Sequence, residues 1–127
     1  MEKPQLGQVL WQDLTVQDAE GIARFYQQVV GWTPKPVPMG EYEDFGMMSG
    51  ETMTAGVCHA RGANAALPPQ WLLYVAVADL EASLAHCEAL GGERVAGPNA
   101  MGADHFAVIR DPAGAVLALY QSGAQNS

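Results

Sequence analysis

The sequence is poor in positive charge. Only 6 of its 127 residues are Lys or Arg, whereas 14 are Asp or Glu, so the formal net charge is −8. A surface that binds nucleic acid neutralises phosphates with clustered Lys and Arg, and here these side chains are scattered. No apolar run approaches the roughly 18 residues of a membrane span, and no basic-then-apolar signal opens the chain. We therefore expect neither a nucleic-acid partner nor a membrane partner.

Cysteine is equally scarce. The two thiols, Cys58 and Cys87, lie far apart in the sequence, lack C-x-x-C spacing and sit in apolar stretches. This placement is typical of reduced, buried thiols and does not indicate a disulfide. On this basis we expect a cytoplasmic protein.

Apolar residues are plentiful, at 49% of the chain, and charged residues account for 16%. This composition is typical of a globular protein and differs from that of a disordered chain. A length of 127 residues is enough to bury a hydrophobic core. We therefore predict one compact domain.

A strand followed by a capped helix is the first recognisable pattern. Residues 8–16 predict the strand, Asp18 is placed to cap the helix, and Gly31 is placed to end it in the left-handed conformation. Apolar residues recur along this helix at three- and four-residue spacing, which predicts a stripe that faces inward. The stripe consists of Ile22, Phe25, Tyr26, Val29 and Val30.

The same pattern recurs 61 residues later. Asp79 corresponds to Asp18, and Gly92 corresponds to Gly31, next to Gly91. A second apolar stripe accompanies these landmarks, and we interpret the coincidence as an internal duplication. The second stripe consists of Leu80, Leu84, Cys87 and Leu90.

Short strands complete each repeat. Alternating prolines confine residues 34–38 to an edge strand or linker, because each proline removes a donor from the ladder. Gly50-Glu51 predicts a hairpin turn, and Gly56 predicts a bulge or a close backbone approach. The other predicted segments are strands at 42–49, 52–59, 71–78 (buried on both faces), 93–96, 105–110 and 116–121, with a loop at 97–103 and a turn at 111–114.

These elements predict an α+β fold made of two tandem βαβββ modules. We predict a single domain over residues 7–122. Its predicted parts are module one at about 7–60, a linker at 61–70 and module two at about 71–122, with flexible termini at 1–6 and 123–127.

The repeated pattern resembles the vicinal oxygen chelate superfamily, which includes glyoxalase I, extradiol dioxygenases and bleomycin resistance proteins. The resemblance rests on Phe25-Tyr26, Gly31-Trp32, Gly91-Gly92 and the turn Asp111-Pro112-Ala113-Gly114. It implies that each module curls its strands into half of a cup, so that the mixed sheet is cup-shaped. It also allows a homodimer, since this fold often pairs modules between chains.

The superfamily's metal-binding members place ligands on strands that face the cup. Three of these positions fall here on Trp11, Leu72 and Ala118, none of which can coordinate a metal ion. The fourth position, near His59 or Glu51, does not align, and one ligand is not a site. We therefore predict no metal and no other cofactor, as in glyoxalase-like members that lack the usual ligands.

Strand alternation predicts which side chains line the cup. On the first strand Leu14 and Val16 should face the helix, which leaves Trp11 and Asp13 on the opposite face. A mainly aromatic and apolar lining is the usual composition of a small-molecule pocket, although simple filling of the core is the alternative. The predicted ligand-binding residues are Trp11, Phe45, Met47, Leu72, Tyr74 and Tyr120.

Asp13 and His105 are the predicted catalytic residues. A carboxylate on a central strand is costly to desolvate, and burial would raise its pKa toward that of a general base. The alternative is that Asp13 is solvated at the strand end, or paired with Arg24, Arg110 or a backbone donor. His105 begins a strand and is placed to face the cup opposite Asp13, unless it is only a polar strand terminus.

The other two histidines, His59 and His86, are weaker candidates for functional residues. His59 ends the fourth predicted strand, where it would serve either as a ligand-binding group or as a polar terminus. His86 falls on the outward side of the second helix and is expected to be a surface residue.

The favoured function is the binding of a small apolar or aromatic molecule in the cup without a metal. The protein would then be a binding or resistance protein, or a metal-independent lyase or isomerase that uses Asp13 with His105 or Tyr74. The first alternative is a metal-dependent glyoxalase or dioxygenase type of enzyme with unusual ligands, such as His59, His105 and Asp13 or Glu51. A second alternative is a degenerate cup that acts through protein contacts.

Overall fold

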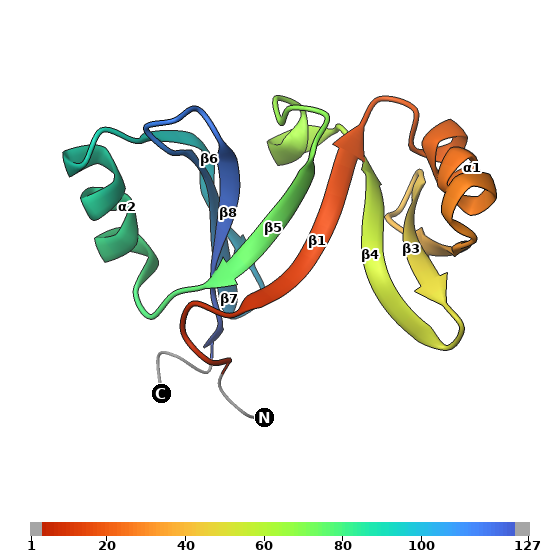
Figure 1. Ribbon diagram of the computed structural model, residues 1–127, viewed down its shortest axis with the longest axis horizontal. Coiled ribbons are helices and arrows are strands. Elements are labelled where there is room, and N and C mark those ends of the chain that lie inside the picture. Colours follow the sequence, from red (N-terminus) through yellow and green to blue (C-terminus); the bar gives the residue numbers. More distant parts are fainter. Residues whose placement is uncertain (1–3, 124–127) are drawn as a thin grey trace. The chain divides into compact units, whose positions relative to one another are not determined.

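The structure, a computed structural model, describes residues 4–123. Within that range the chain divides into two compact units, one of residues 11–71 and one of residues 72–123 together with 4–10. Each contains one helix and a four-stranded mixed sheet, in the order βαβββ (Figure 1). The predicted α+β class with two tandem modules is therefore confirmed.

Module one contains the strand order β2-β3-β4-β1, with β1 parallel to β4 and the other neighbours antiparallel. The proline-rich β2 lies at the edge, as predicted, because an edge strand can leave its missing N–H donors facing away from the sheet. The bounds are β1 (Val9–Val16), α1 (Ala19–Val30), β2 (Thr33–Pro38), β3 (Glu43–Ser49) and β4 (Thr52–His59).

Helix α1 begins and ends where the sequence predicts. The Asp18 carboxylate accepts a hydrogen bond from the Gly21 amide at 3.0 Å, and Gly31 adopts φ of 90° and donates to the Gln27 carbonyl. An aspartate cap and a left-handed glycine satisfy backbone groups that the helix leaves unpaired.

The predicted apolar stripe of α1 is only partly correct. Ile22 and Tyr26 pack against the core, but Phe25, Val29 and Val30 are 53%, 63% and 51% exposed. The helix instead contacts the sheet through Ala19 and Ala23, which are buried and one turn apart. Small side chains let the helix backbone approach the sheet closely, and this turns the larger apolar residues outward. The buried centre of module one consists of Ala19, Ala23, Met47, Ala55 and Val57.

The β3–β4 hairpin turns at Gly50-Glu51 as predicted. The irregularity in its ladder lies between Met47 and Met48, and it does not involve Gly56. Gly56 is instead a site of close approach, because a methyl group added there would lie 3.1 Å from the Asp13 Cβ atom.

Module two has the strand order β5-β8-β7-β6, with β5 parallel to β8. The loop predicted at 97–103 is mostly strand, since β6 continues past the Gly97-Pro98 bond and pairs with β7 through two register shifts. Strand β5 is not buried on both faces, because Leu73 is 43% exposed. The bounds are β5 (Trp71–Ala76), α2 (Leu80–Ala89), β6 (Glu93–Met101), β7 (Asp104–Arg110) and β8 (Val116–Gln121).

Helix α2 is capped by Asp79, which accepts from the Ala82 amide at 3.2 Å. Leu80 and Leu84 are buried as predicted, but Leu90 is 76% exposed. The left-handed residue after α2 is Gly91, with φ of 95°, and not Gly92. Gly92 is required for a different reason: a methyl group there would lie 2.9 Å from the Arg110 carbonyl oxygen.

Hydrogen bonds are present near both ends of the described chain, and the flexibility of residues 1–6 and 123–127 remains a prediction. The Gly7 amide donates to the Ala76 carbonyl at 2.8 Å, and the Gly123 amide donates to the Asp104 carboxylate at 2.6 Å. Ser122 is buried. The remaining terminal positions, 1–3 and 124–127, lie outside the described residues.

The segment predicted to link the modules contains a short 3-10 helix, Gly62–Asn64. Neither α1 nor α2 is long and apolar enough to cross a membrane, and the same holds for every helix within residues 4–123.

Substitution of Asp18 tests whether the capping aspartate, which is present at the start of both helices, stabilises the fold. Asp18→Ala should lower the free energy of unfolding by about 1 kcal/mol, because it removes the acceptor for the Gly21 amide. Asp18→Asn keeps a side-chain oxygen and should retain most of the stability. Urea unfolding followed by circular dichroism measures both, and equal losses in the two variants would show that the cap contributes nothing specific.

Candidate functional site

Four side-chain positions of β1 and β4 point away from α1, and we call them the Trp11 face: Trp11, Asp13, Gly56 and Cys58. Asp13 pairs with Gly56 in the parallel ladder. A methyl group added at Gly56 would lie 3.6 Å from the Trp11 Nε1 atom, so the indole lies against this glycine. Ala55 and Val57, on either side of Gly56, pack toward the helix, which confirms the predicted facing of Trp11 and Asp13.

Cys58 is a protonated thiol on this face. Its pKa is raised strongly, first by burial and then by the carboxylates of Asp13 and Asp44. The Asp44 side chain also accepts a hydrogen bond from the thiol. Because the thiolate is the reactive form of cysteine, this environment suppresses nucleophilic chemistry at Cys58.

Asp44, on β3, joins the thiol to a histidine. One carboxylate oxygen, Oδ1, accepts the backbone amide of His59 at 2.9 Å and lies 3.2 Å from the Nδ1 atom of the same residue. Asp44 is 9% exposed, so these bonds offset the cost of burying its charge. The contact turns the Nδ1 side of the His59 ring toward Asp44.

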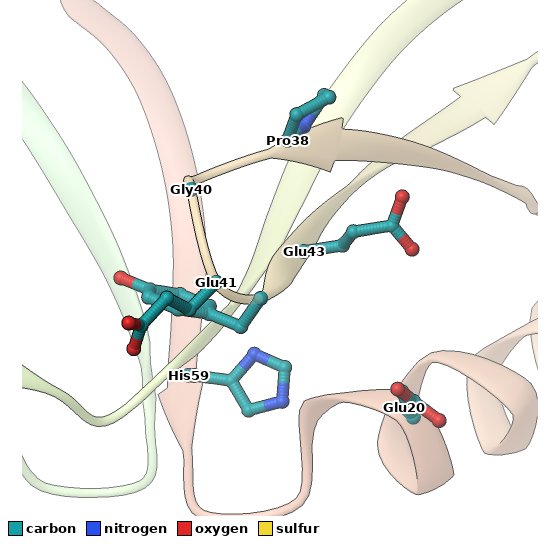
Figure 2. Close-up of a pocket in the computed structure, with 7 residues that line it drawn as sticks. Glu20, Pro38, Gly40, Glu41, Glu43 and His59 are labelled. Carbon is teal, nitrogen blue, oxygen red and sulfur yellow. The ribbon is translucent and has the colours of Figure 1, made fainter.

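A hollow of about 440 Å³ lies beside His59, at the end of β4, and we call it the His59 hollow. Figure 2 shows the side chains of Glu20, Glu41, Glu43 and His59 around it. Next to it, the Tyr42 ring lies edge-on to the His59 ring, with centroids 5.4 Å apart, and the Arg61 guanidinium lies 4.1 Å from the Tyr42 centroid. The full lining is Glu20, Pro38, Gly40, Glu41, Tyr42, Glu43 and His59.

Two predicted ligand-binding residues of module one lie on the helix side. Met47 is fully buried among Ala23 and Val57, and Phe45 packs against the same cluster. The structure therefore separates these two from Trp11, which lies on the opposite face of the strands. Their position in the β3 alternation directs Phe45 and Met47 toward α1, and ligand binding by them remains a prediction.

The predicted residues of module two, in contrast, share one face, because Leu72 and Tyr74 on β5 and Tyr120 on β8 alternate with the residues that pack against α2. Tyr74 lies with its ring centroid 6.3 Å from that of Phe106 and pairs in the ladder with Ala118, while Leu72 is fully buried. Tyr120 donates a hydrogen bond to the Asp104 carboxylate. Burial, and then this carboxylate, raise the pKa of Tyr120 to about 12. Ligand binding by these side chains remains a prediction.

His105 does not occupy the face that the sequence predicted. It lies two residues before Ala107, which packs against α2, and it lines a hollow beside the start of that helix with Asp79, Leu80 and Glu81. Alternation along β7 therefore directs His105 to the helix-covered side of its own module. Asp13, in contrast, is on the side of β1 away from its helix. The two side chains therefore face different sides of their modules, which does not support the predicted catalytic pairing of Asp13 with His105. His86, as predicted, is exposed on α2.

The residues present do not fit the metal that the fold family implies. Trp11, Leu72 and Ala118 stand at three ligand positions and cannot coordinate. Across residues 4–123, no group of three or more His, Cys, Asp or Glu side chains is placed to hold a metal ion. A catalytic divalent metal needs about three protein ligands of suitable type, so this donor set does not supply the family's usual site.

Comparison with known proteins identifies the family. A family model described as a glyoxalase-like domain matches residues 11–120. The chain belongs to the glyoxalase-like domain family. The resemblance to the vicinal oxygen chelate superfamily, read from the repeated pattern, is thereby confirmed.

Among curated proteins, this glyoxalase-like domain is similar to the Mycobacterium tuberculosis protein named "Putative glyoxylase CFP32". The two are 27% identical over 120 residues, which cover 94% of this chain and 46% of that protein. It is also 30% identical over 132 residues to the anthracycline biosynthesis protein DnrV of Streptomyces peucetius, covering 92% of this chain and 48% of DnrV. The domain thus spans about half the length of the curated relatives it matches.

Solved structures support the fold of this glyoxalase-like domain. Methylmalonyl-CoA epimerase from Mycobacterium tuberculosis aligns with a TM-score of 0.53 and 15% identity, over 95% of this chain and 92% of that one. A methylmalonyl-CoA epimerase in complex with methylmalonyl-CoA and NH4+ gives the same TM-score at 16% identity, over 94% and 97% of the two chains. At these identities the likeness shows the fold alone.

Asp44 and the contact of Tyr42 with Arg61 were not predicted from the sequence. Asp44 could have been predicted, because a carboxylate inside a strand and next to apolar residues such as Phe45 and Met47 is expected to be buried and paired. Arg61 could not, because its contact with Tyr42 depends on how the chain leaves β4.

The raised pKa of Cys58 predicts slow thiol–disulfide exchange with Ellman's reagent in the folded protein. In a Cys87→Ser variant, Cys58 should react with Ellman's reagent at pH 8 at least about tenfold more slowly than after unfolding, because an unfolded thiol has a pKa near 8.5. In a Cys58→Ser variant, the same reaction measures the reactivity of the half-buried Cys87 for comparison.

The raised pKa of Cys58 also predicts how the stability of the fold depends on pH. The Cys58 contribution is fully present below pH 8.5 and is lost as the pH rises above it, because only the unfolded thiol then ionises. Rapid labelling of folded Cys58, with a midpoint near pH 8.5, would contradict the assigned environment.

Proposed function

We propose that this domain binds a small planar aromatic molecule without using a metal ion, and that the Trp11 face contacts it. The observation that carries this proposal is the residue at the first ligand position of the metal-binding relatives. There the chain has Trp11, whose indole lies against Gly56 and beside Asp13. The position that would bind a metal ion thus carries an aromatic surface.

The side chains of this face suit such a ligand. An indole ring offers a large surface for stacking, and Gly56 adds no side chain that would cover the strand beside it. Asp13 supplies a polar group at the same level of the ladder, since it pairs with Gly56. A few polar groups in an aromatic surrounding are the usual means by which a small-molecule site fixes the orientation of its ligand.

The relatives' names support the aromatic class. DnrV and DauV, 30% and 28% identical to this chain, are named for anthracycline biosynthesis. Anthracyclines contain a fused, planar ring system, which is the shape that stacks on an indole. The extension to this chain is our proposal, because the match covers about half of each relative.

Binding is measured by titrating the protein with quinizarin, a bare dihydroxyanthraquinone, and following tryptophan emission. Trp11→Ala should weaken binding by about tenfold or more, since buried Trp contacts are typical binding hot spots. Trp71→Phe is the matched control. Trp71 packs with Tyr26 at a centroid distance of 5.3 Å in the core of the first unit, so this variant should bind normally.

A second arm of the experiment addresses the metal. Treatment with EDTA should leave quinizarin affinity unchanged. Loss of binding on chelation, with recovery on addition of Zn²⁺ or Mn²⁺, would overturn the metal-independent proposal, and equal affinity of Trp11→Ala and the wild type would remove the Trp11 face from it.

A further inference from the structure

Two glycines lie side by side on the face of module one that carries Trp11. Gly46 on β3 and Gly56 on β4 are direct partners in the antiparallel ladder, and Gly46 alternates with Phe45 and Met47, which pack toward α1. Glycine inside a strand weakens it, because there is no side chain to pack. Neither of these glycines has a positive φ, so the backbone conformation does not require glycine at either position. The reason lies instead in the side chains that occupy the space above them.

A large side chain lies over each of the two glycines. A methyl group added at Gly46 would lie 2.6 Å from the Met53 Sδ atom, so the Met53 thioether fills the place of that methyl group. A methyl group added at Gly56 would lie 3.6 Å from Nε1 and 3.7 Å from Cζ2 of Trp11. Directly opposite residues of an antiparallel pair are about 5 Å apart. The indole and the thioether are therefore neighbours on one face.

Met53 has the properties of a contact residue more than those of a core residue. It is 38% exposed, whereas Met47 on the other face is fully buried. Its thioether is flexible and polarizable, and sulfur makes favourable contacts with aromatic rings. Together with Trp11 it extends one apolar surface from β1 across β4 to β3, which is two strand spacings or about 10 Å. A single six-membered ring is too narrow to cover both side chains, whereas three fused rings are wide enough.

We propose that Met53 is a second contact residue of the site at Trp11, and that the two side chains select molecules with several fused aromatic rings over single-ring compounds. This inference rests on the function proposed above and narrows its ligand class. Gly46 and Gly56 are positioning residues, because they let the thioether and the indole lie close to the strands and leave the outer surfaces of both to the ligand. Gly46 acts only through Met53.

The test is a titration of the whole chain, with its methionine methyl groups labelled with ¹³C, by two compounds. Quinizarin has three fused rings, and o-hydroxyacetophenone presents the same hydroxyl–carbonyl pair on one ring. Quinizarin should shift the Met53 methyl resonance saturably, and it should bind at least about tenfold more tightly than the single-ring compound. Met53→Ala should weaken quinizarin binding about three- to tenfold, which is the range of a sulfur–aromatic contact, and should leave o-hydroxyacetophenone binding unchanged.

Two further variants test the arrangement of the site. Gly46→Ala adds a methyl group where the Met53 side chain lies, so it should displace the thioether and weaken quinizarin binding as Met53→Ala does. Met39→Ala is the matched control, because Met39 is also exposed, at 47%, but lies in the turn between β2 and β3. This control should bind as the wild type does. Circular dichroism of all three variants checks that they fold.

The outcomes separate this inference from the function on which it rests. Quinizarin binding that Trp11→Ala weakens and Met53→Ala does not would overturn the role of Met53 and leave the proposed function in place. Equal losses for the two compounds in Met53→Ala, or a loss of the same size in Met39→Ala, would also overturn the selection by Met53. Absence of quinizarin binding to the wild type would overturn both proposals.

Discussion

The sorting of strand side chains onto two faces is the constraint on which the rest of the structure depends. Successive residues of a strand point to opposite sides of the sheet, and each module covers one side with its single helix. In module one, Met47, Ala55 and Val57 therefore form a core with α1, while Trp11 and Asp13 face away from it. The same rule places Ala107 and Leu119 against α2 and carries His105 to that side. Which face a residue occupies thus decides whether it can share a site with another.

Features set by local chemistry were predictable from the sequence. Asp18 and Asp79 cap their helices because a carboxylate next to a first turn finds unpaired amides within reach. Gly31 ends α1 because its left-handed conformation is accessible to glycine at little cost. These capping and terminating residues, together with their repetition, were enough to predict both modules and the resemblance to the family.

Features set by packing were not predictable in the same way. The apolar residues of α1 have a helical period, but the period does not say which part of the stripe meets the sheet. Ala19 and Ala23 decide this, because their small side chains permit the closest approach, and Phe25 is then left more than half exposed. Strand β6 escaped prediction because Gly97 and Pro98 indicate a loop, whereas pairing with β7 continues on both sides of them.

The candidate site shows how a polar group can be both buried and useful. Asp44 holds its charge in a nearly buried place because the His59 amide, the His59 ring and the Cys58 thiol all donate to it. Each donor has a separate consequence. The thiol stays protonated, first because it is buried, and also because ionising it would bring a further negative charge beside Asp13 and Asp44. The imidazole is held with Nδ1 toward Asp44.

The hydrogen bonds around Asp44 are present in module one, and comparison with the second repeat shows how the two modules differ. Both repeats supply a capped helix, a hollow and a strand that ends beside it, so the backbone requirements are met twice. Polar residues at equivalent places were then free to diverge, because Gln121 completes the first turn of α2 whereas His59 is oriented by Asp44. The same divergence separates Trp11 from Leu72, an aromatic and an aliphatic residue at the corresponding metal positions of the family. Two repeats with the same backbone plan therefore carry different side chains at equivalent positions, which is why only one of them places an aromatic ring on the face away from its helix at this position.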